Sequence, residues 1–208
     1  MMLTEICSKE ITDRLNAQGY LAVLSLATPE QFANEVAHMY RNGYKNVRFV
    51  GGNETPFIVS REELYPYDKF MKEDYVTNPA LSQAMVALFQ ETRKTSKVEA
   101  GAPEEAFTRM LKKREEEFVT ALKNAEFMVP CVKTENGEDI EISFQYLDVT
   151  EQIGSDNGEK VIAIPVFTDG FEMNKCYPGK TEDMLCTFDE LVATVVELGA
   201  SGIIINAL

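Results

Sequence analysis

The chain has 208 residues, of which 45% are hydrophobic and 26% charged, and its formal net charge is -14. This length and balance support a buried core without disulfide staples and exclude disordered, fibrous and low-complexity classes. Residues 104–208 hold 9 basic and 21 acidic side chains, a field that repels phosphate backbones and anionic lipid, so neither nucleic acid nor a membrane is an expected partner.

The four cysteines and the single histidine also exclude function classes. Cys7, Cys131, Cys176 and Cys186 show no CxxC spacing and are expected to be reduced and mostly buried, so no metal or other cofactor is predicted. Residues 1–19 are amphipathic and charged, unlike a signal peptide, and the longest apolar runs fall short of the roughly 18 residues that a spanning helix needs. The protein is therefore expected in the cytoplasm.

In chain order, apolar spacing predicts a helix over residues 3–17 and a strand over 20–27. Thr28 and Gln31 flank a proline in a capping box, which predicts a helix ending at Gly43. Strands over 47–50 and 56–59 are expected to form a hairpin. Residues 20–52 are interpreted as a βαβ unit that starts a parallel sheet.

The rest of the first half, residues 60–103, is more polar. Residues 60–63 form another capping box, residues 65–78 are expected to be a covering loop, and Asn78-Pro79 opens a helix through about residue 92. Residues 94–103 lack apolar periodicity and predict a linker. The predicted division is an N-terminal α/β region over 1–102 and a second domain over 103–208.

The second half opens with a helix predicted over 104–124, whose charge run faces solvent. Period-two patterns then predict a hairpin of strands over 127–133 and 140–147, a polar loop over 148–159, and a strand over 161–167. A short helix over 169–175, a strand over 184–187, a helix capped by Thr187 and Glu190, and an interior strand over 202–208 complete the pattern. The expected fold class is α+β, with a mixed β-sheet packed against helices in two linked α/β regions.

Four short motifs of the second half carry a family resemblance: Val129-Pro130, the Ile-Pro-Val-Phe-Thr-Asp segment at 164–169, Phe-Asp-Glu-Leu at 188–191, and Gly-Ile-Ile-Ile-Asn at 202–206. With these motifs, residues of about 104–208 resemble the SseB N-terminal domain family, named for an enhanced-serine-sensitivity phenotype. The resemblance implies a compact α+β domain and brings no defined activity or catalytic residue. Ala207 departs from the family pattern, which tends to have proline there.

Several candidate groups favour a structural interpretation. His38 lies off the apolar stripe of its helix and is expected to face solvent, and no nucleophile elbow accompanies it. The Gly51-Gly52-Asn53 segment lacks phosphate-loop spacing and is interpreted as a hairpin turn. The carboxylates of one loop, Asp148, Glu151, Asp156 and Glu159, do not have EF-hand spacing and are expected to be solvated.

The sharper candidate lies where a strand passes into a helix. Thr168 and Asp169 stand at such a junction, where side chains and free amides commonly meet ligands, although capping of the short helix is the competing interpretation. Tyr177, in a turn nearby, is a candidate rim residue for a binding groove. Thr168, Asp169 and Tyr177 are thus the candidate binding residues, and no catalytic residue is assigned.

The missing catalytic groups favour a non-enzymatic protein-interaction or regulatory module. Its expected partner is another protein, of basic character if the acidic surface serves the contact, or a second copy of the chain. The alternative is a binding protein for a small metabolite of amino-acid type, or an enzyme, using the loop after the strand at 164–167.

Overall fold

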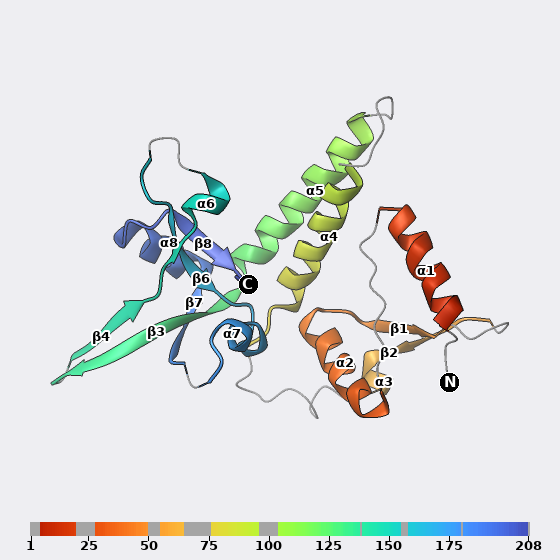
Figure 1. Cartoon of the computed structure of the whole chain (residues 1–208), viewed down its shortest axis with the longest axis horizontal. Helices are drawn as coiled ribbons and strands as arrows, with labels where there is room; N and C mark the ends of the chain where they lie inside the picture. Colours follow the sequence, from red (N-terminus) through yellow and green to blue (C-terminus); the bar gives the residue numbers. More distant parts are fainter. Residues whose placement is uncertain are drawn as a thin grey trace. The chain divides into compact units, whose positions relative to one another are not determined.

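The computed structural model describes residues 5–19, 28–49, 55–64, 76–95, 104–137, 139–154, 158–179 and 181–207. The chain divides into two compact units, each described by itself below (Figure 1). Unit 1 comprises Met1–Glu73 and Pro79–Ala121, and unit 2 comprises Asp74–Asn78 and Leu122–Leu208. Helices and strands occur in both, so the predicted α+β class is confirmed. The domain boundary near residue 102 stays a prediction.

The described residues of unit 1 form helices and one β-hairpin. Its elements are α1 (Glu5–Ala17), α2 (Pro29–Arg41), β1 (Asn46–Phe49), β2 (Phe57–Ser60), α3 (Arg61–Leu64), α4 (Pro79–Thr95) and α5 (Glu104–Lys123) as far as Ala121. The capping box of Thr28 and Gln31 is present at the start of α2, and Ser60 and Glu63 form the second box at α3. Both predicted capping boxes are confirmed.

The predicted hairpin is also confirmed, because β1 and β2 pair antiparallel, with Phe49 opposite Phe57 and their rings stacked 5.0 Å apart. The strand predicted over 20–27 and the turn at residues 51–53 lie outside the described residues, so the βαβ unit stays a prediction. Gly43 ends the turn after α2 with a φ of +73°, and a Cβ there would lie 2.6 Å from the carbonyl oxygen of Pro79. Only glycine fits that position.

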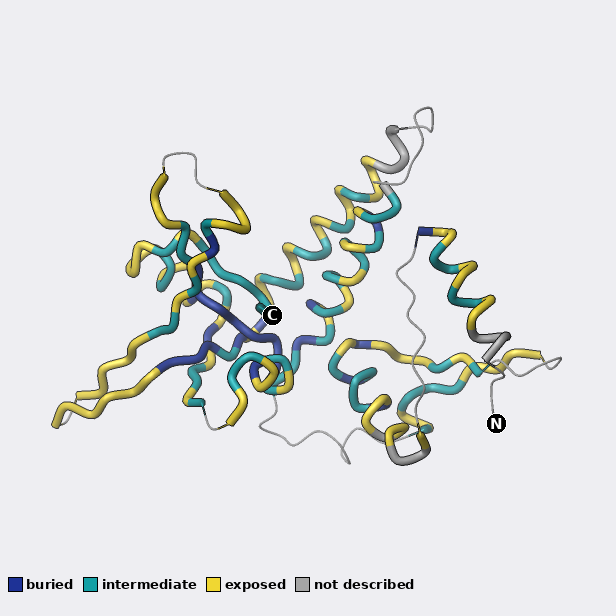
Figure 2. The backbone as a smooth tube through the Cα atoms, in the orientation of Figure 1, coloured by how far each residue is buried: buried dark blue, intermediate teal, exposed yellow. Residues whose placement is uncertain are grey.

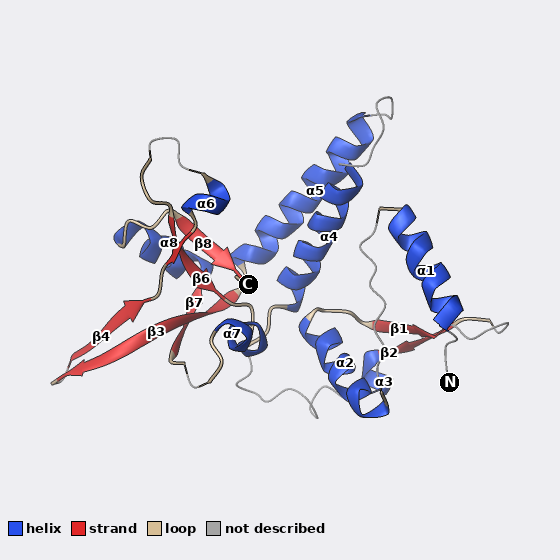
Figure 3. Ribbon diagram, in the orientation of Figure 1, coloured by secondary structure: helices blue, strands red, loops and turns tan. Residues whose placement is uncertain are grey.

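Unit 2 opens with three strands in succession and then alternates helices and strands (Figure 3). Its elements are β3 (Glu126–Asn136), β4 (Asp139–Phe144), β5 (Leu147–Asp148), α6 (Thr150–Ile153), β6 (Ile162–Val166), α7 (Gly170–Cys176), β7 (Asp183–Thr187), α8 (Phe188–Glu197) and β8 (Gly202–Ile205). The predicted box of Thr187 and Glu190 caps α8, and Gly199 follows it with a φ of +64°.

The described strands of this unit form two three-stranded sheets. One has the order β4-β3-β7 and is antiparallel throughout. The other has the order β5-β6-β8, in which β6 pairs antiparallel with β5 and parallel with β8, as the predicted mixed sheet requires. In the part of the unit that the structure describes, the sheets join at one bridge, where Met128 and Phe167 exchange two backbone hydrogen bonds of 2.9 Å.

Two prolines explain why the join stops after one bridge. Continuing the antiparallel register of Met128 and Phe167 by two residues on each strand places Pro130 opposite Pro165. Both prolines are fully buried, and neither has an N–H to donate to the other strand. The sheet therefore forks, and the chain from β4 to β5 pairs first with β3 and then with β6 across the fork.

The structure corrects three sequence-based expectations in this unit. The segment 148–159 is not simply a loop, because Asp148 pairs in β5 and α6 follows it. The strand predicted over 140–147 ends at Phe144, because the pairing passes from β3 to β6 there. Strand β8 lies at an edge of its sheet in the described part of the chain, although its apolar run is typical of an interior strand.

The core of unit 2 lies around the fork, where most of residues 127–131 of β3 and residues 163–166 of β6 are buried (Figure 2). Its largest fully buried side chains include Phe127, Phe167, Ile164 and Leu191. Among the described helices, none is both long and apolar enough to cross a membrane.

Candidate functional site

The candidate residues Thr168 and Asp169 lie between the end of β6 and the start of α7. Phe167, the residue before them, forms the bridge to β3, which fixes the backbone at this point. Thr168 is 1% exposed and Asp169 is 4% exposed. The predicted junction is thus correctly located, but its two polar side chains are directed into the protein.

Two asparagines form hydrogen bonds with all three polar groups of Thr168: its N–H, its hydroxyl and its carbonyl. Its N–H and hydroxyl donate to Asn206 Oδ1 over 3.0 and 3.2 Å, and Asn206 Nδ2 donates back to the hydroxyl over 3.0 Å. Its carbonyl accepts from Asn78 Nδ2 over 2.8 Å. Asn206 has a φ of 53°, in the left-handed region that asparagine tolerates better than most residues.

Asn78 also completes the start of β3. Its Nδ2 donates to the carbonyl of Glu126 over 2.6 Å, and its Oδ1 accepts from the Glu126 N–H over 3.1 Å. The side-chain amide therefore pairs with Glu126 as another strand's backbone would. We call Asn78, Thr168 and Asn206 the Thr168 network. It joins the start of β3, the end of β6 and the end of β8 by hydrogen bonds.

Asp169 caps α7, as the competing interpretation expected. Its Oδ1 accepts from the N–H of Glu172 over 2.9 Å, and its backbone is extended, as is usual for an N-cap residue. Glu172 in turn forms an ion pair with Lys175 at 2.7 Å. The capping interpretation of this carboxylate is confirmed.

Tyr177 lies at the other end of α7, where its N–H donates to the carbonyl of Met173 over 2.9 Å. Its ring meets the ring of Phe167 edge to face at 5.8 Å, and its partial burial raises the pKa of the phenol. The structure therefore brings Tyr177 close to the Thr168 junction. Whether these three residues bind a ligand stays a prediction.

The cysteines of unit 2 are reduced, and two of them are inert in character. Burial raises the pKa of the Cys131 and Cys186 thiols, which suppresses the thiolate form that reacts. Cys176 donates its S–H to the carbonyl of Ala207, so the residue that departs from the family pattern is held against α7. The side chain of Cys7 lies outside those described.

Other candidates have structural partners. His38, which was expected to face solvent, is half-buried, and Arg41 Nη2 lies 2.6 Å from its Nδ1. Asp148 accepts from the N–H and hydroxyl of Thr150 and pairs with Lys160 at 3.1 Å, which holds its pKa at about 2. Asp156 lies outside the described residues. Among the residues described, no three His, Cys, Asp or Glu side chains converge as a metal site.

Sequence reasoning missed the two asparagines of the Thr168 network. Asn78 was interpreted only as the residue before a helix-opening proline, and Asn206 only as the end of an apolar motif. A polar amide directly after a run of four strand residues was a usable signal at Asn206. No local signal identifies Asn78, because its partners lie 48 and 90 residues away in sequence.

A second surface of unit 2 is exposed and apolar. We define the arm as residues 131–136 of β3 with the whole of β4, and it extends beyond the buried half of the sheet (Figure 2). Ile140 is 63% exposed and Ile142 is 38% exposed, with Val132 exposed on the other strand. The arm thus presents large apolar side chains on a two-stranded ribbon, outside the predicted site.

The comparison with known families matches the SseB protein N-terminal domain over residues 104–208. No curated protein and no solved structure matches the chain. The matched range contains all four motifs that carried the resemblance, among them both prolines of the fork and Asn206 of the Thr168 network. The chain therefore belongs to the SseB protein N-terminal domain family.

Proposed function

We propose that this member of the SseB family is a non-enzymatic protein-interaction or regulatory module. The observation that supports the proposal is the arm, where Ile140 and Ile142 are exposed on a strand at the sheet edge. Exposed apolar side chains gathered on one element mark interaction surfaces more often than isolated ones do. The arm is therefore the surface at which we expect a partner to bind.

The state of the polar residues supports the same proposal. The side chains of Thr168, Asn78 and Asn206 bond to one another or to backbone, and Asp169 caps a helix. Groups that are buried and already bonded gain little from a ligand, because an existing hydrogen bond must break first. These residues act in our proposal as supports of the fold.

The charge of the chain supports a basic protein as the partner. The net charge of -14 favours association with a positively charged surface and disfavours nucleic acid. A cytoplasmic setting agrees with the three free cysteines described in unit 2, since reduced thiols are usual there.

The test is affinity capture with two matched double variants. Ile140→Thr with Ile142→Thr removes apolar surface from the arm but keeps β-branched residues, which suit a strand. Val192→Thr with Val196→Thr removes two exposed valines from α8 as the control. We expect the arm variant to lose a partner that the native chain and the control both retain. Capture that is identical for all three proteins would contradict the proposal.

The metabolite alternative has its own measurement. A ligand at about 100 times its dissociation constant adds roughly 2.7 kcal/mol of stability, which raises the melting temperature of a chain this size by several degrees. A screen of amino acids and related metabolites against the native chain and Tyr177→Phe would therefore detect a site beside Phe167. A shift that the substitution abolishes would replace the interaction proposal with the metabolite one.

A further inference from the structure

The direction of the backbone groups of β3 can be read from its partners. The N–H of Cys131 donates to the carbonyl of Glu182, and the N–H of Lys133 donates to a carboxylate oxygen of the same residue, both on the β7 side. Because successive N–H groups of a strand point to opposite sides, those of Val132 and Thr134 point toward β4. The register with β3 then fixes the direction of every backbone group in β4.

The outward groups of β4 belong to its isoleucines. Ser143 pairs with Val132 and Glu141 with Thr134, so the backbone groups of Ser143 and Glu141 point toward β3. The N–H and C=O groups of Ile140 and Ile142 point away from β3, toward the outer edge of the sheet. No strand in the described part of the chain pairs with that edge. It is a template of unpaired donors and acceptors.

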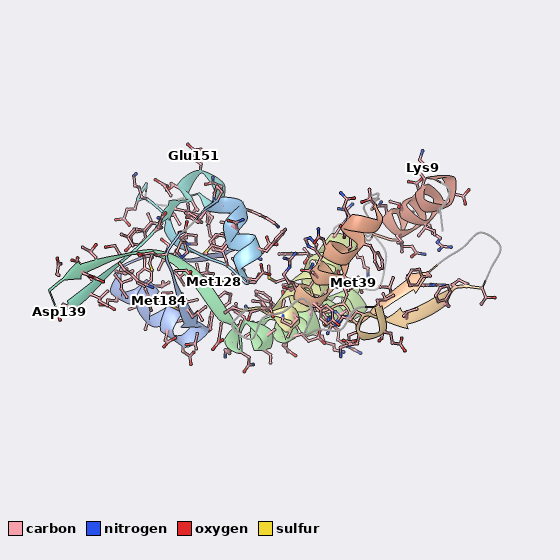
Figure 4. The ribbon with its side chains drawn as sticks, turned by 90° about the horizontal axis from the view of Figure 1, so that it is seen from below. Lys9, Met39, Met128, Asp139, Glu151 and Met184 are labelled. Carbon is pink, nitrogen blue, oxygen red and sulfur yellow. The ribbon has the colours of Figure 1, made fainter. Side chains whose placement is uncertain are left out.

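The two faces of β4 differ in chemistry. Alternate side chains of a strand lie on opposite faces, so Ile140 and Ile142 share one face while Asp139 and Glu141 share the other. Figure 4 shows Asp139 at the tip of the arm, far from Met128 at the fork. A strand added at this edge would therefore meet apolar side chains on one face and carboxylates on the other.

The acidic face lacks neutralising partners. Residues 133–144 contain four acidic side chains and one basic, Lys133, a net charge of -3. The ammonium group of Lys133 donates to the carbonyl of Asp183, on the β7 side of β3. None of the ion pairs among the described residues includes Asp139 or Glu141, and the one hydrogen bond seen to Glu141 comes from the neutral side-chain amide of Asn136 at 3.3 Å.

We propose that the outer edge of β4 binds an extended segment of another protein in which apolar residues alternate with lysine or arginine. Backbone pairing would supply the affinity, and the two faces of β4 would select the alternation. A second copy of β4 is a poor occupant, because antiparallel self-pairing brings the carboxylates of Asp139 and Glu141 together from two chains. This inference rests on the proposed function and specifies its partner.

The experiment measures the binding of three fluorescently labelled seven-residue peptides to the full chain by fluorescence anisotropy. The first alternates lysine and valine, the second has the same composition in two blocks, and the third alternates glutamate and valine. We expect binding of the alternating lysine peptide alone, weakening as salt rises because exposed charge pairs are screened. Equal binding of the block peptide would overturn the proposal, since net charge alone would then explain the affinity.

Two variants separate backbone pairing from side-chain contact. Ile142→Pro removes one outward N–H without breaking the ladder to β3, and Ile142→Ala removes the same side chain but keeps the N–H. We expect the proline variant to bind about tenfold more weakly than the alanine variant. Equal affinities would show that no strand is added at this edge. Circular dichroism of both variants checks that the arm still forms.

A third variant needs no change of backbone. Asp139→Asn with Glu141→Gln should weaken the lysine peptide about fivefold, while Glu62→Gln with Glu63→Gln in unit 1 should leave it unchanged. If neither double variant changes the affinity for the lysine peptide, the carboxylates of β4 do not select basic residues. If the captured partner survives Ile142→Pro, the chain remains an interaction module but not by strand addition. Dimers that Ile142→Pro dissociates would instead assign the edge to a second copy.

Discussion

Replacing Asn78 tests the central structural claim, because this side chain bonds three backbone groups that no other residue is seen to satisfy. Asn78→Ala removes the bonds to the carbonyl and N–H of Glu126 and to the carbonyl of Thr168. At about 1 kcal/mol net for each hydrogen bond, the expected loss of unfolding free energy is about 3 kcal/mol. The Thr168 carbonyl, the most deeply buried of the three groups, supplies the largest share.

The measurement is urea unfolding followed by far-ultraviolet circular dichroism, since the chain has no tryptophan. Native-state hydrogen exchange of the β3 amides reports on unit 2 specifically, which matters because two units need not unfold together. We expect the lost protection to concentrate in β3 and β6.

The matched control is Asn174→Ala, which removes an exposed asparagine of unit 2 whose Oδ1 accepts one hydrogen bond of 3.4 Å. This change should cost less than about 0.5 kcal/mol. If Asn78→Ala costs no more than Asn174→Ala, water replaces the amide without loss, and the Thr168 network does not support the fold.

Three further predictions concern ionisable groups. The pKa of Asp148 is about 2, so the contribution of this carboxylate to folding stability is present above the ordinary pKa of 3.8 and is lost as pH falls toward 2. An NMR titration of the Asp148 carboxyl with its midpoint near 3.8 would refute this. The N–H and hydroxyl of Thr187 lower the pKa of Glu190 below 4.5, so the cap of α8 weakens as pH falls through that lowered pKa. Amide exchange in α8 should therefore depend on pH in this range, and Glu190→Gln should remove the dependence. Burial raises the pKa of the Tyr177 phenol above 10.0, so the contribution of this group to folding stability is complete below pH 10 and is lost as pH rises through the raised pKa. An ultraviolet titration of the native chain and of Tyr177→Phe should differ by one phenol that ionises late. Ionisation of that phenol at the ordinary pKa would contradict its packing on Phe167.

The local parts of the fold could be predicted because short-range chemistry determines them. Thr28 with Gln31 and Thr187 with Glu190 form their boxes within four residues, so the sequence is sufficient to identify them. The cap at Asp169 is equally local. Each of these motifs satisfies backbone groups of the same turn, which requires no knowledge of the rest of the chain.

The errors arose where distant partners decide the structure. The apolar run of β8 matched an interior strand, but strand position depends on which neighbours arrive, and only β6 is seen beside it. The end of β4 at Phe144 depends on the fork between β3 and β6. Likewise, the strand-to-helix junction at Thr168 and Asp169 was correctly located, but the inward direction of the Thr168 hydroxyl depends on Asn206, 38 residues further on.

The facing prolines of the fork also protect the strands from misalignment while the sheet assembles. Sliding β3 against β6 by two residues would set Pro130 opposite Phe167, or Pro165 opposite Met128, and each such pair has one N–H in place of two. The native alignment thus gathers both missing donors into one pair and leaves Met128 and Phe167 fully bonded, whereas either slide would put one missing donor into each of two pairs. By withholding donors on both sides of one position, the chain gives its two sheets a single preferred place to meet.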